Sequence, residues 1–288
     1  MINAGWERVK DSEYHAMPHM SSHMLMKFMR SPRHYIEAKK NPREPTPAMR
    51  FGTLVHSLTL EPENIIEKIT YEPDVDRRTK IGKEFFAEWN ANLQKGDVVV
   101  AKGERSYDLQ RSLGEDYLVV TNDKLESAKA MAERVRNSYA FQCYEDSDPA
   151  YEMCGFCEIV TPGGTVQLRC KPDIRLKKIP IFCDLKTTED ARVDKFRWSI
   201  KNYDYLLQLA FYQLVIETIE GRGHEAQILA IETEAPYEMV CYDIPQVLLD
   251  YERQRIFSAL SQFAVCEATN TWPGYPEVPI TLDLQTTR

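Results

Sequence analysis

Apolar positions in the first fifty residues recur with the spacing of a helix. In the segment 21–40, apolar residues such as Leu25 and Phe28 lie three or four positions apart, which predicts one apolar helical face. Two Ser residues open this segment and Pro42 follows it, as expected at the two ends of a helix. We therefore expect residues 1–50 to form a helical entry segment.

Helical patterns continue further along the chain with less regularity. The apolar stretch 49–60 predicts a short helix that holds His56 near the core. The segment 123–139 predicts an amphipathic helix, and the rest of 63–140 carries many charges with mixed helical patterns. This part of the chain is therefore expected to be mainly helical.

Between residues 150 and 188 the pattern changes to that of β-strands. Apolar runs alternate with turn residues, and a Pro-Gly-Gly turn at Pro162 to Gly164 favours a meander of three strands. A helix is then expected over 195–220 and two further strands over 226–244. A last helix is expected to begin at Pro245.

This order of elements predicts one α/β domain over residues 1–288, with a mixed central sheet flanked by helices. The sheet and its following helix occupy residues 150–244, and a C-terminal helix and an irregular tail occupy 245–288. The sequence contains no internal repeat or linker that would divide the chain.

Composition adds few constraints. Hydrophobic residues make up 43% of the 288 residues and charged residues 28%, as in ordinary globular proteins. No apolar run approaches the ~20 residues that span a bilayer, and the first residues lack the apolar core of a signal peptide, so a cytoplasmic location is expected. The net charge of −8 argues against a protein covered in positive potential but is compatible with a local basic groove.

The seven Cys residues are scattered and odd in number, which does not indicate a disulfide framework. Several lie in apolar, strand-like runs, where a free Cys behaves as a small hydrophobic residue. Only Cys154 and Cys157 have metal-like spacing, and no second pair completes a structural zinc site.

Asp184 and Lys186 stand at the end of an otherwise apolar strand, where charged side chains have no obvious packing role. If Lys177 to Pro180 form a four-residue loop, the strands on either side pair so that Asp173 lies opposite Asp184. Directly opposed residues have Cβ atoms ~5 Å apart, so the two carboxylates repel unless a cation lies between them. Lys186 follows Asp184 by two positions and therefore projects from the same face.

Two acids and one Lys on the same side of a hairpin suit phosphodiester hydrolysis. Hard divalent cations prefer oxygen ligands, a metal polarises the phosphoryl oxygen and lowers the pKa of its water, and a Lys stabilises or orients the attacking hydroxide. The competing interpretation is a solvated strand edge with a surface ion pair. The apolar flanks and the matched spacing of the acids favour the first interpretation.

Four sequence motifs resemble those of the PD-(D/E)xK nuclease superfamily. "KPDI" (171–174) and "CDLKTT" (183–188) resemble its acidic signature, while "GTLVHSL" (52–58) and "QLAFYQLV" (208–215) resemble the His-bearing and Gln-x-x-x-Tyr helices of its RecB-type branch. Further stretches are similar to the nuclease domain of the RecE, or exonuclease VIII, family: "SEYHAMPHMSSHML", "DRRTKIGKE", "NYDYLLQLAFY" and "TWPGY". The resemblance covers nearly the whole chain in the right order and indicates a phage or prophage version.

The resemblance implies a PD-(D/E)xK restriction-endonuclease-like core and a role for each matched residue. One or two Mg²⁺ ions, for which Mn²⁺ can substitute, would be held by His56, Asp173, Asp184 and the backbone carbonyl of Leu185. Lys186 would serve the attacking water. Gln208 and Tyr212, at i and i+4 on one helical face, would contact the phosphate backbone or support Lys186. Without the motifs, His56 and the Gln–Tyr pair would be interpreted as packed residues of apolar helices.

Further residues are candidates for contacts with DNA or metal. The clearest basic cluster consists of Arg77, Arg78, Lys80 and Lys83. It would grip phosphates without reading sequence, unless it is a solvated charged face. Tyr203 and Tyr205 precede the Gln–Tyr helix and could stack on an unpaired base. Either Glu152 or Glu158 could add a carboxylate near the site.

The resemblance implies a metal-dependent exodeoxyribonuclease that degrades one strand of linear double-stranded DNA, 5′ to 3′ and without ATP. It also implies a homo-oligomeric ring of three or four copies at DNA ends and a RecT-like single-strand annealing partner, in the cytoplasm of a bacterial host. Two alternatives stay open. An iron–sulfur nuclease of the same superfamily would need one Cys early and three late in the chain, which this sequence does not provide. A catalytically inactive DNA-binding protein on the same fold is disfavoured because every expected catalytic position is occupied.

Overall fold

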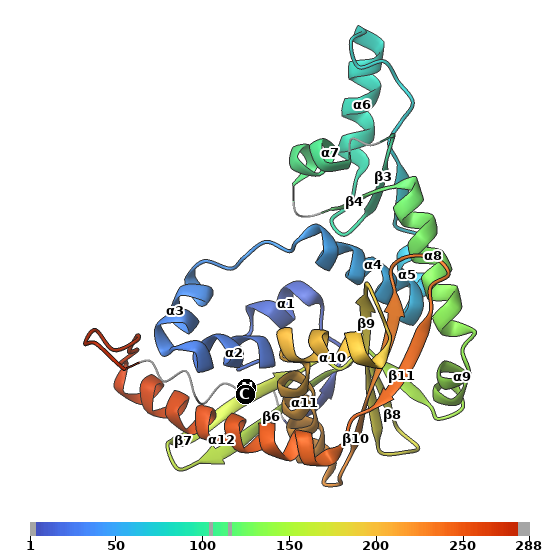
Figure 1. The fold of residues 1–288 in the computed structure, drawn as a ribbon. Coiled ribbons are helices and arrows are strands. Elements are labelled where there is room, and N and C mark those ends of the chain that lie inside the picture. Colours follow the sequence, from blue (N-terminus) through green and yellow to red (C-terminus); the bar gives the residue numbers. More distant parts are fainter. Residues whose placement is uncertain (1–3, 104–105, 115–116, 282–288) are drawn as a thin grey trace.

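The computed structural model describes residues 4–103, 106–114 and 117–281 as a mixed α/β protein (Figure 1). Its central five-stranded sheet has the order β11–β10–β9–β8–β5. These strands are β5 (Pro149–Tyr151), β8 (Ile174–Leu176), β9 (Ile181–Thr188), β10 (Glu225–Glu232) and β11 (Met239–Asp243). The pair β9–β10 is parallel and the other neighbours are antiparallel, which confirms the predicted mixed sheet.

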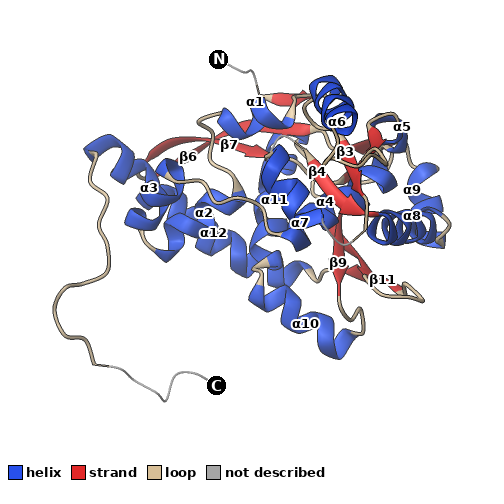
Figure 2. Ribbon diagram, turned by 90° about the horizontal axis from the view of Figure 1, so that it is seen from above, coloured by secondary structure: helices blue, strands red, loops and turns tan. Residues whose placement is uncertain are grey.

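Helices cover both faces of the central sheet, as Figure 2 shows on either side of β9. The first face is covered by α2 (Ser22–Arg30), α11 (Tyr205–Glu220) and α12 (Gln246–Thr269), and the second by α4 (Pro47–Leu60), α8 (Asn122–Arg136) and α9 (Tyr139–Glu145). Phe182 of β9 is buried in the first layer and Leu185 in the second. Because successive residues of a strand point to opposite faces, Asp184 and Lys186 point toward the layer of α11.

The strands between residues 150 and 188 do not form the predicted three-stranded meander. β6 (Cys154–Thr161) and β7 (Gly164–Cys170) pair around the predicted Pro-Gly-Gly turn, and β1 (Gly5–Glu7) joins β6 in a separate antiparallel sheet. The prediction was wrong because the chain changes sheets at Pro172, which has no N–H to donate to a continuing ladder.

The stretch 63–140, predicted as mainly helical, also contains a parallel sheet. Its elements are α5 (Pro62–Ile66), β2 (Ile69–Tyr71), α6 (Lys80–Asn92), β3 (Val98–Ala101), α7 (Ser106–Leu113) and β4 (Leu118–Thr121). Figure 1 shows α6, α7, β3 and β4 projecting from the rest of the protein as one unit, here called the projecting unit (β2 to β4). Strand β3 is buried along its whole length, so its sequence lacks the alternation that marks a half-buried strand.

The predicted entry segment consists of short helices rather than one long one. They are α1 (Asp11–Ala16), α2 and α3 (Pro32–Lys40). The break falls at Ser31, whose hydroxyl accepts a hydrogen bond from the His34 N–H and caps α3, with Pro32 as its first residue. Similarly, the helical region 195–220 is split into α10 (Val193–Asn202) and α11 by Asp204, whose φ is 53°.

The remaining helices agree with the sequence patterns. α4, α8 and α12 form where the patterns predicted them, and the tail is irregular from 271 to 281, where the described residues end. None of the helices within the described residues is both long and apolar enough to cross a membrane.

Candidate active site

The acidic hairpin has the register that the sequence predicts. β8 and β9 pair with Ile174 opposite Cys183. The same register, continued by one residue, places Asp173 opposite Asp184. The backbone N–H of Leu185 donates a hydrogen bond of 2.7 Å to Oδ2 of Asp173, which fixes the first carboxylate against the strand that carries the second.

Three side chains from separate elements form a group that could hold a metal ion. His56 comes from the third turn of α4, Glu152 directly follows β5, and Asp173 directly precedes β8. Their ligand atoms lie within 4.8 Å of one another, and Nδ1 of His56 is 3.5 Å from Oδ1 of Asp173. In the part of the chain that the structure describes, this is the only group of three or more His, Cys, Asp or Glu side chains so arranged.

Asp184 lies beside this group without belonging to it. Its Oδ2 contacts Nζ of Lys186 in a nearly buried ion pair. Nζ of Lys186 also lies 4.9 Å from the ring centroid of Tyr205 at the start of α11. The structure therefore brings the predicted His, both Asp residues and the Lys to one place, while metal ligation by Asp184 and by the Leu185 carbonyl stays a prediction.

Burial dominates the electrostatics of these groups. It raises the pKa of Glu152 to about 7, with the Asp173 carboxylate adding to the rise and Lys171, whose Nζ is 2.6 Å from Oε2, opposing it. Burial also raises the pKa of Asp184 to about 6, although Lys186 opposes the shift. Acids with raised pKa values favour a cation beside them, because a cation stabilises their charged forms.

His56 and Asp173 shift in the opposite sense. Burial alone would lower the pKa of His56 and raise that of Asp173, but each stabilises the charged form of the other. The net result is a raised pKa for His56 and a lowered pKa for Asp173. The pair is therefore a candidate imidazolium–carboxylate contact until a metal competes for the same atoms.

This donor set fits a divalent cation. Carboxylate oxygens suit Mg²⁺ and Mn²⁺, and an imidazole nitrogen extends the set toward transition metals. The half-buried carboxylate of Glu152 and the buried carboxylates of Asp173 and Asp184 share two nearby basic side chains, Lys171 and Lys186. Once His56 is neutral, as a metal ligand must be, three carboxylates face two ammonium groups. A divalent ion would offset the remaining negative charge, so these residues fit a divalent metal.

Helix α11 supplies the polar groups that face the strand. Nε2 of Gln208 donates a hydrogen bond of 3.0 Å to the hydroxyl of Tyr212, whose pKa burial raises well above its ordinary value. Tyr203 stacks on Tyr205 with ring centroids 5.6 Å apart and planes at 25°. Tyr203 is 65% exposed. The stacked rings of Tyr203 and Tyr205 therefore extend from the protein surface to the ammonium group of Lys186.

The predicted basic cluster lies elsewhere. Arg77 contacts Glu72 and lies with its guanidinium carbon 3.5 Å from the ring centroid of Phe86, and Arg78 is 2.9 Å from Asp76. Lys80 and Lys83 belong to α6 of the projecting unit, which points away from β9 in Figure 1. The structure does not bring this cluster to the carboxylates, and its charges are partly neutralised by local acids.

Sequence reasoning could not choose between the two Glu residues near the strands. Glu158 lies on β6 in the separate sheet, where it accepts a hydrogen bond of 3.0 Å from Gln167. Glu152 has a left-handed φ of 53°, and its N–H donates to the Asp173 carbonyl at 3.1 Å. The residue type at position 152 does not predict this backbone conformation. The "KPDI" motif likewise contains Lys171 but does not indicate that Lys171 pairs with Glu152.

The Cys residues add no metal site in the ranges that the structure covers. Cys154 and Cys157 are buried cysteines of β6, and burial raises the pKa of Cys157 to about 12. A protonated, buried thiol is a poor metal ligand. The structure therefore gives no support to an iron–sulfur centre.

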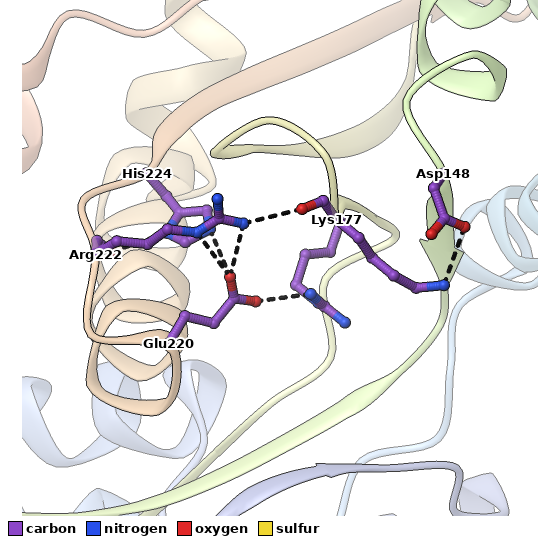
Figure 3. A network of polar contacts seen from close by, with 6 residues as sticks. Asp148, Lys177, Glu220, Arg222 and His224 are labelled. Carbon is purple, nitrogen blue, oxygen red and sulfur yellow. Dashed lines mark hydrogen bonds and ion pairs between the residues drawn. The ribbon is translucent and has the colours of Figure 1, made fainter.

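The opposite end of the hairpin is anchored by a polar network (Figure 3). Glu220, the last residue of α11, contacts Arg175 at 2.7 Å, Arg222 at 3.1 Å and His224 at 3.1 Å. Arg222 also donates to the carbonyl of Lys177, which pairs with Asp148. The network therefore joins β8 to the helix that carries Gln208 and Tyr212, which are the two elements on either side of the site.

Comparisons with known proteins agree with this geometry. A family model described as "PDDEXK-like domain of unknown function (DUF3799)" matches residues 21–278. No curated protein sequence matches the chain. A crystal structure described as "Putative exonuclease" from Eubacterium rectale is similar with a TM-score of 0.57 and 12% identity, over 92% of this chain and 88% of that one. A second crystal structure, SSO0001, reaches a TM-score of 0.28 and 11% identity over 46% of this chain and 66% of that one. The family match and the first likeness together confirm the predicted restriction-endonuclease-like core.

Proposed function

The chain belongs to the family of PDDEXK-like domains, and from this premise we propose that it is a divalent-metal-dependent nuclease that degrades one strand of linear duplex DNA from an end. The observation that carries the proposal is the group of His56, Glu152 and Asp173 beside the Asp184–Lys186 pair. Such a concentration of buried charge is unfavourable for folding alone, and it has the composition that phosphodiester hydrolysis needs.

The residues divide the chemical work between them. His56, Glu152 and Asp173 would hold the metal, with Asp184 on the neighbouring strand. A bound divalent cation supplies charge stabilisation and an activated water. Lys186 stays protonated because its neighbours Asp184 and Asp173 outweigh the effect of burial and raise its pKa. Its ammonium group can therefore orient the attacking water or stabilise the phosphoryl oxygens as negative charge develops.

Gln208 and Tyr212 complete the site from α11. Their mutual hydrogen bond fixes two polar groups on the face toward Asp184 and Lys186, where they can receive a phosphate oxygen. Tyr205 covers Lys186, and the exposed ring of Tyr203 can stack on a base that leaves the duplex. Leu185 would offer its carbonyl as a further metal ligand.

The finer properties of the proposal come from the ordered motifs shared with the RecE family. They are 5′ to 3′ polarity, independence of ATP, use of Mg²⁺ or Mn²⁺, a ring of three or four copies, and cooperation with a RecT-like annealing protein in a bacterial host cell. The printed name of the Eubacterium rectale structure supports exonuclease activity in the same sense. We propose residues 1–288 as one nuclease domain.

A comparison of linear and closed circular plasmid tests this function. In low salt with Mg²⁺, the protein should convert linear DNA to mononucleotides and leave closed circles intact. Asp184→Asn should abolish the activity, whereas Asp190→Asn, a half-buried acid paired with Arg192 beyond the same strand, should not. Discrete cuts within the closed circle would show that the protein is an endonuclease rather than an exonuclease. If neither DNA is cleaved with any divalent metal, the proposal that the protein is a nuclease is wrong.

A further inference from the structure

One short segment of this acidic chain is strongly basic. Between Met20 and Arg50 there are seven Lys or Arg residues and two Glu residues, whereas the whole chain has 36 basic and 44 acidic residues. Six of the seven lie on α2, α3 and the connection 41–46 that leads to α4. We call them the basic arm, and they are Lys27, Arg30, Arg33, Lys39, Lys40 and Arg43.

Packing fixes which way the arm faces. Leu25, Phe28 and Tyr35 form the buried side of α2 and α3. The rings of Phe28 and Tyr35 lie 5.5 Å and 5.2 Å from the ring of Phe263 on α12. Because one side of this helix pair is held against the body, the charged residues of the other side are directed to solvent. Arg30, Arg33, Lys39, Lys40 and Arg43 are all exposed.

The charges of the arm are not neutralised locally. Among the described residues, none of the six forms an ion pair with a carboxylate. Arg30 donates instead to the hydroxyl of Tyr275 at 3.4 Å, and Nζ of Lys39 lies 5.9 Å from the ring centroid of Tyr35. Arg77 and Arg78 of the projecting unit differ in this respect, since each has an acidic partner. A polyanion can bind cationic side chains that have no acidic partner without first breaking their ion pairs.

The arm leads directly to the candidate active site. Its connection enters α4, where Arg50 precedes the metal-site residue His56 by six positions, or about 9 Å along the helix. Between them, Gly52 packs on β9, since a Cβ at Gly52 would lie 3.5 Å from Oγ1 of Thr187. Thr187 directly follows Lys186 in the strand. The first turns of α4 therefore connect the arm to the strand that carries Lys186.

We propose that the basic arm is the track that holds the phosphates of the duplex as its end enters the site. This inference rests on the proposed function and adds the path of the substrate. Duplex DNA carries one negative charge per ~1.7 Å of its axis, so a row of exposed cations binds it at any position along its length. Such contacts carry no sequence information, which suits an enzyme that moves along DNA from an end.

Charge removal on the arm tests the track. Lys39→Gln, Lys40→Gln and Arg43→Gln are combined in one variant, and Lys124→Gln, Lys129→Gln and Arg134→Gln on α8 form a control with the same loss of charge. Binding to a blunt duplex is measured with Ca²⁺ between 50 and 200 mM salt, with circular dichroism as a check on folding. The slope of log K against log salt should flatten by about two to three in the arm variant, at ~0.9 per lost phosphate contact, and by less than one in the control.

A charge-conserving variant, Lys39→Arg with Lys40→Arg and Arg43→Lys, should restore the original slope. An arm variant with an unchanged slope, or a control that flattens as much, would overturn the track. The outcomes separate this inference from the proposed function. If the wild-type protein cleaves DNA while the arm variant binds normally, only the track is wrong. If the wild-type protein binds through the arm but cleaves nothing with any divalent metal, only the proposed function is wrong.

Discussion

The backbone N–H of Leu185 donates a hydrogen bond of 2.7 Å to Oδ2 of Asp173. This contact joins the acid before β8 to the strand that carries Asp184. With Oδ2 held in this way, Oδ1 faces Nδ1 of His56 at 3.5 Å. The donor belongs to the main chain of a paired strand, so the Asp173 carboxylate is oriented before any ligand arrives.

Glu152 is the residue whose role most directly tests the site. Glu152→Gln keeps the shape of the side chain but removes the charge, so Mg²⁺ affinity measured by titration calorimetry should fall at least ~10-fold. The folded protein should be no less stable without metal at pH 8, because burial already disfavours this charge. Glu158→Gln, on the separate sheet, is the matched control. Equal loss of affinity in both variants would remove Glu152 from the metal group.

Lys186 should act on the rate rather than on metal affinity. Lys186→Met keeps most of the side-chain volume and removes the ammonium group, so the single-turnover rate should fall by ~10²-fold or more. Mg²⁺ affinity should change little or increase, since the competing cation beside Asp184 is gone. Lys178→Met, at the far turn of the hairpin, provides the control. A large loss of Mg²⁺ binding with normal chemistry would contradict this role.

The sequence predicted the hairpin well because its information is local. A four-residue loop between two apolar strands determines the register, and the register places Asp173 opposite Asp184. The helices that carry His56 and Gln208 were predicted for the same reason, since each contains a long run rich in apolar residues. The ordered motifs then connected these distant parts.

Other features depend on contacts that no local pattern records. The role of Glu152 follows from a left-handed backbone and from the chain's change of sheet at Pro172. The buried strand at Val98 was hidden within a charged, helical region. The basic arm was missed because its cations are spread over two helices and a connection, and only packing shows that they face outward together.

Gly163 in the β6–β7 turn should be essential for packing. A Cβ at this position would collide with the backbone carbonyl of Ser261 on α12, so Gly163→Ala should lower the free energy of unfolding by ~1–3 kcal/mol. At Gly223 a Cβ would meet only Oε1 of Glu217, at 3.8 Å, so Gly223→Ala should be nearly neutral. Chemical denaturation of both variants measures the difference, and equal stabilities would show that the turn shifts without cost.

The acidity of the site predicts how metal binding depends on pH. The pKa values of Asp184, about 6, and Glu152, about 7, lie above their ordinary values of 3.8 and 4.5. Protonation therefore favours the metal-free fold, which should lose stability as pH rises from about 4 to 7. A divalent cation needs the deprotonated forms and must displace these protons. As pH rises, metal affinity should therefore increase while the stability of the metal-free protein decreases.

We expect Mg²⁺ affinity to rise steeply between about pH 5.5 and pH 7.5, as both acids and the His56 imidazolium lose their protons, and to level off at higher pH. Titration calorimetry at pH 6.5 in two buffers with different ionisation enthalpies should show net proton release on binding. Glu152→Gln removes the group that titrates near 7, so this variant should release fewer protons on binding than the wild-type protein. An affinity that is constant over this range, with no proton release in either buffer, would show that the ion binds away from Glu152 and Asp184.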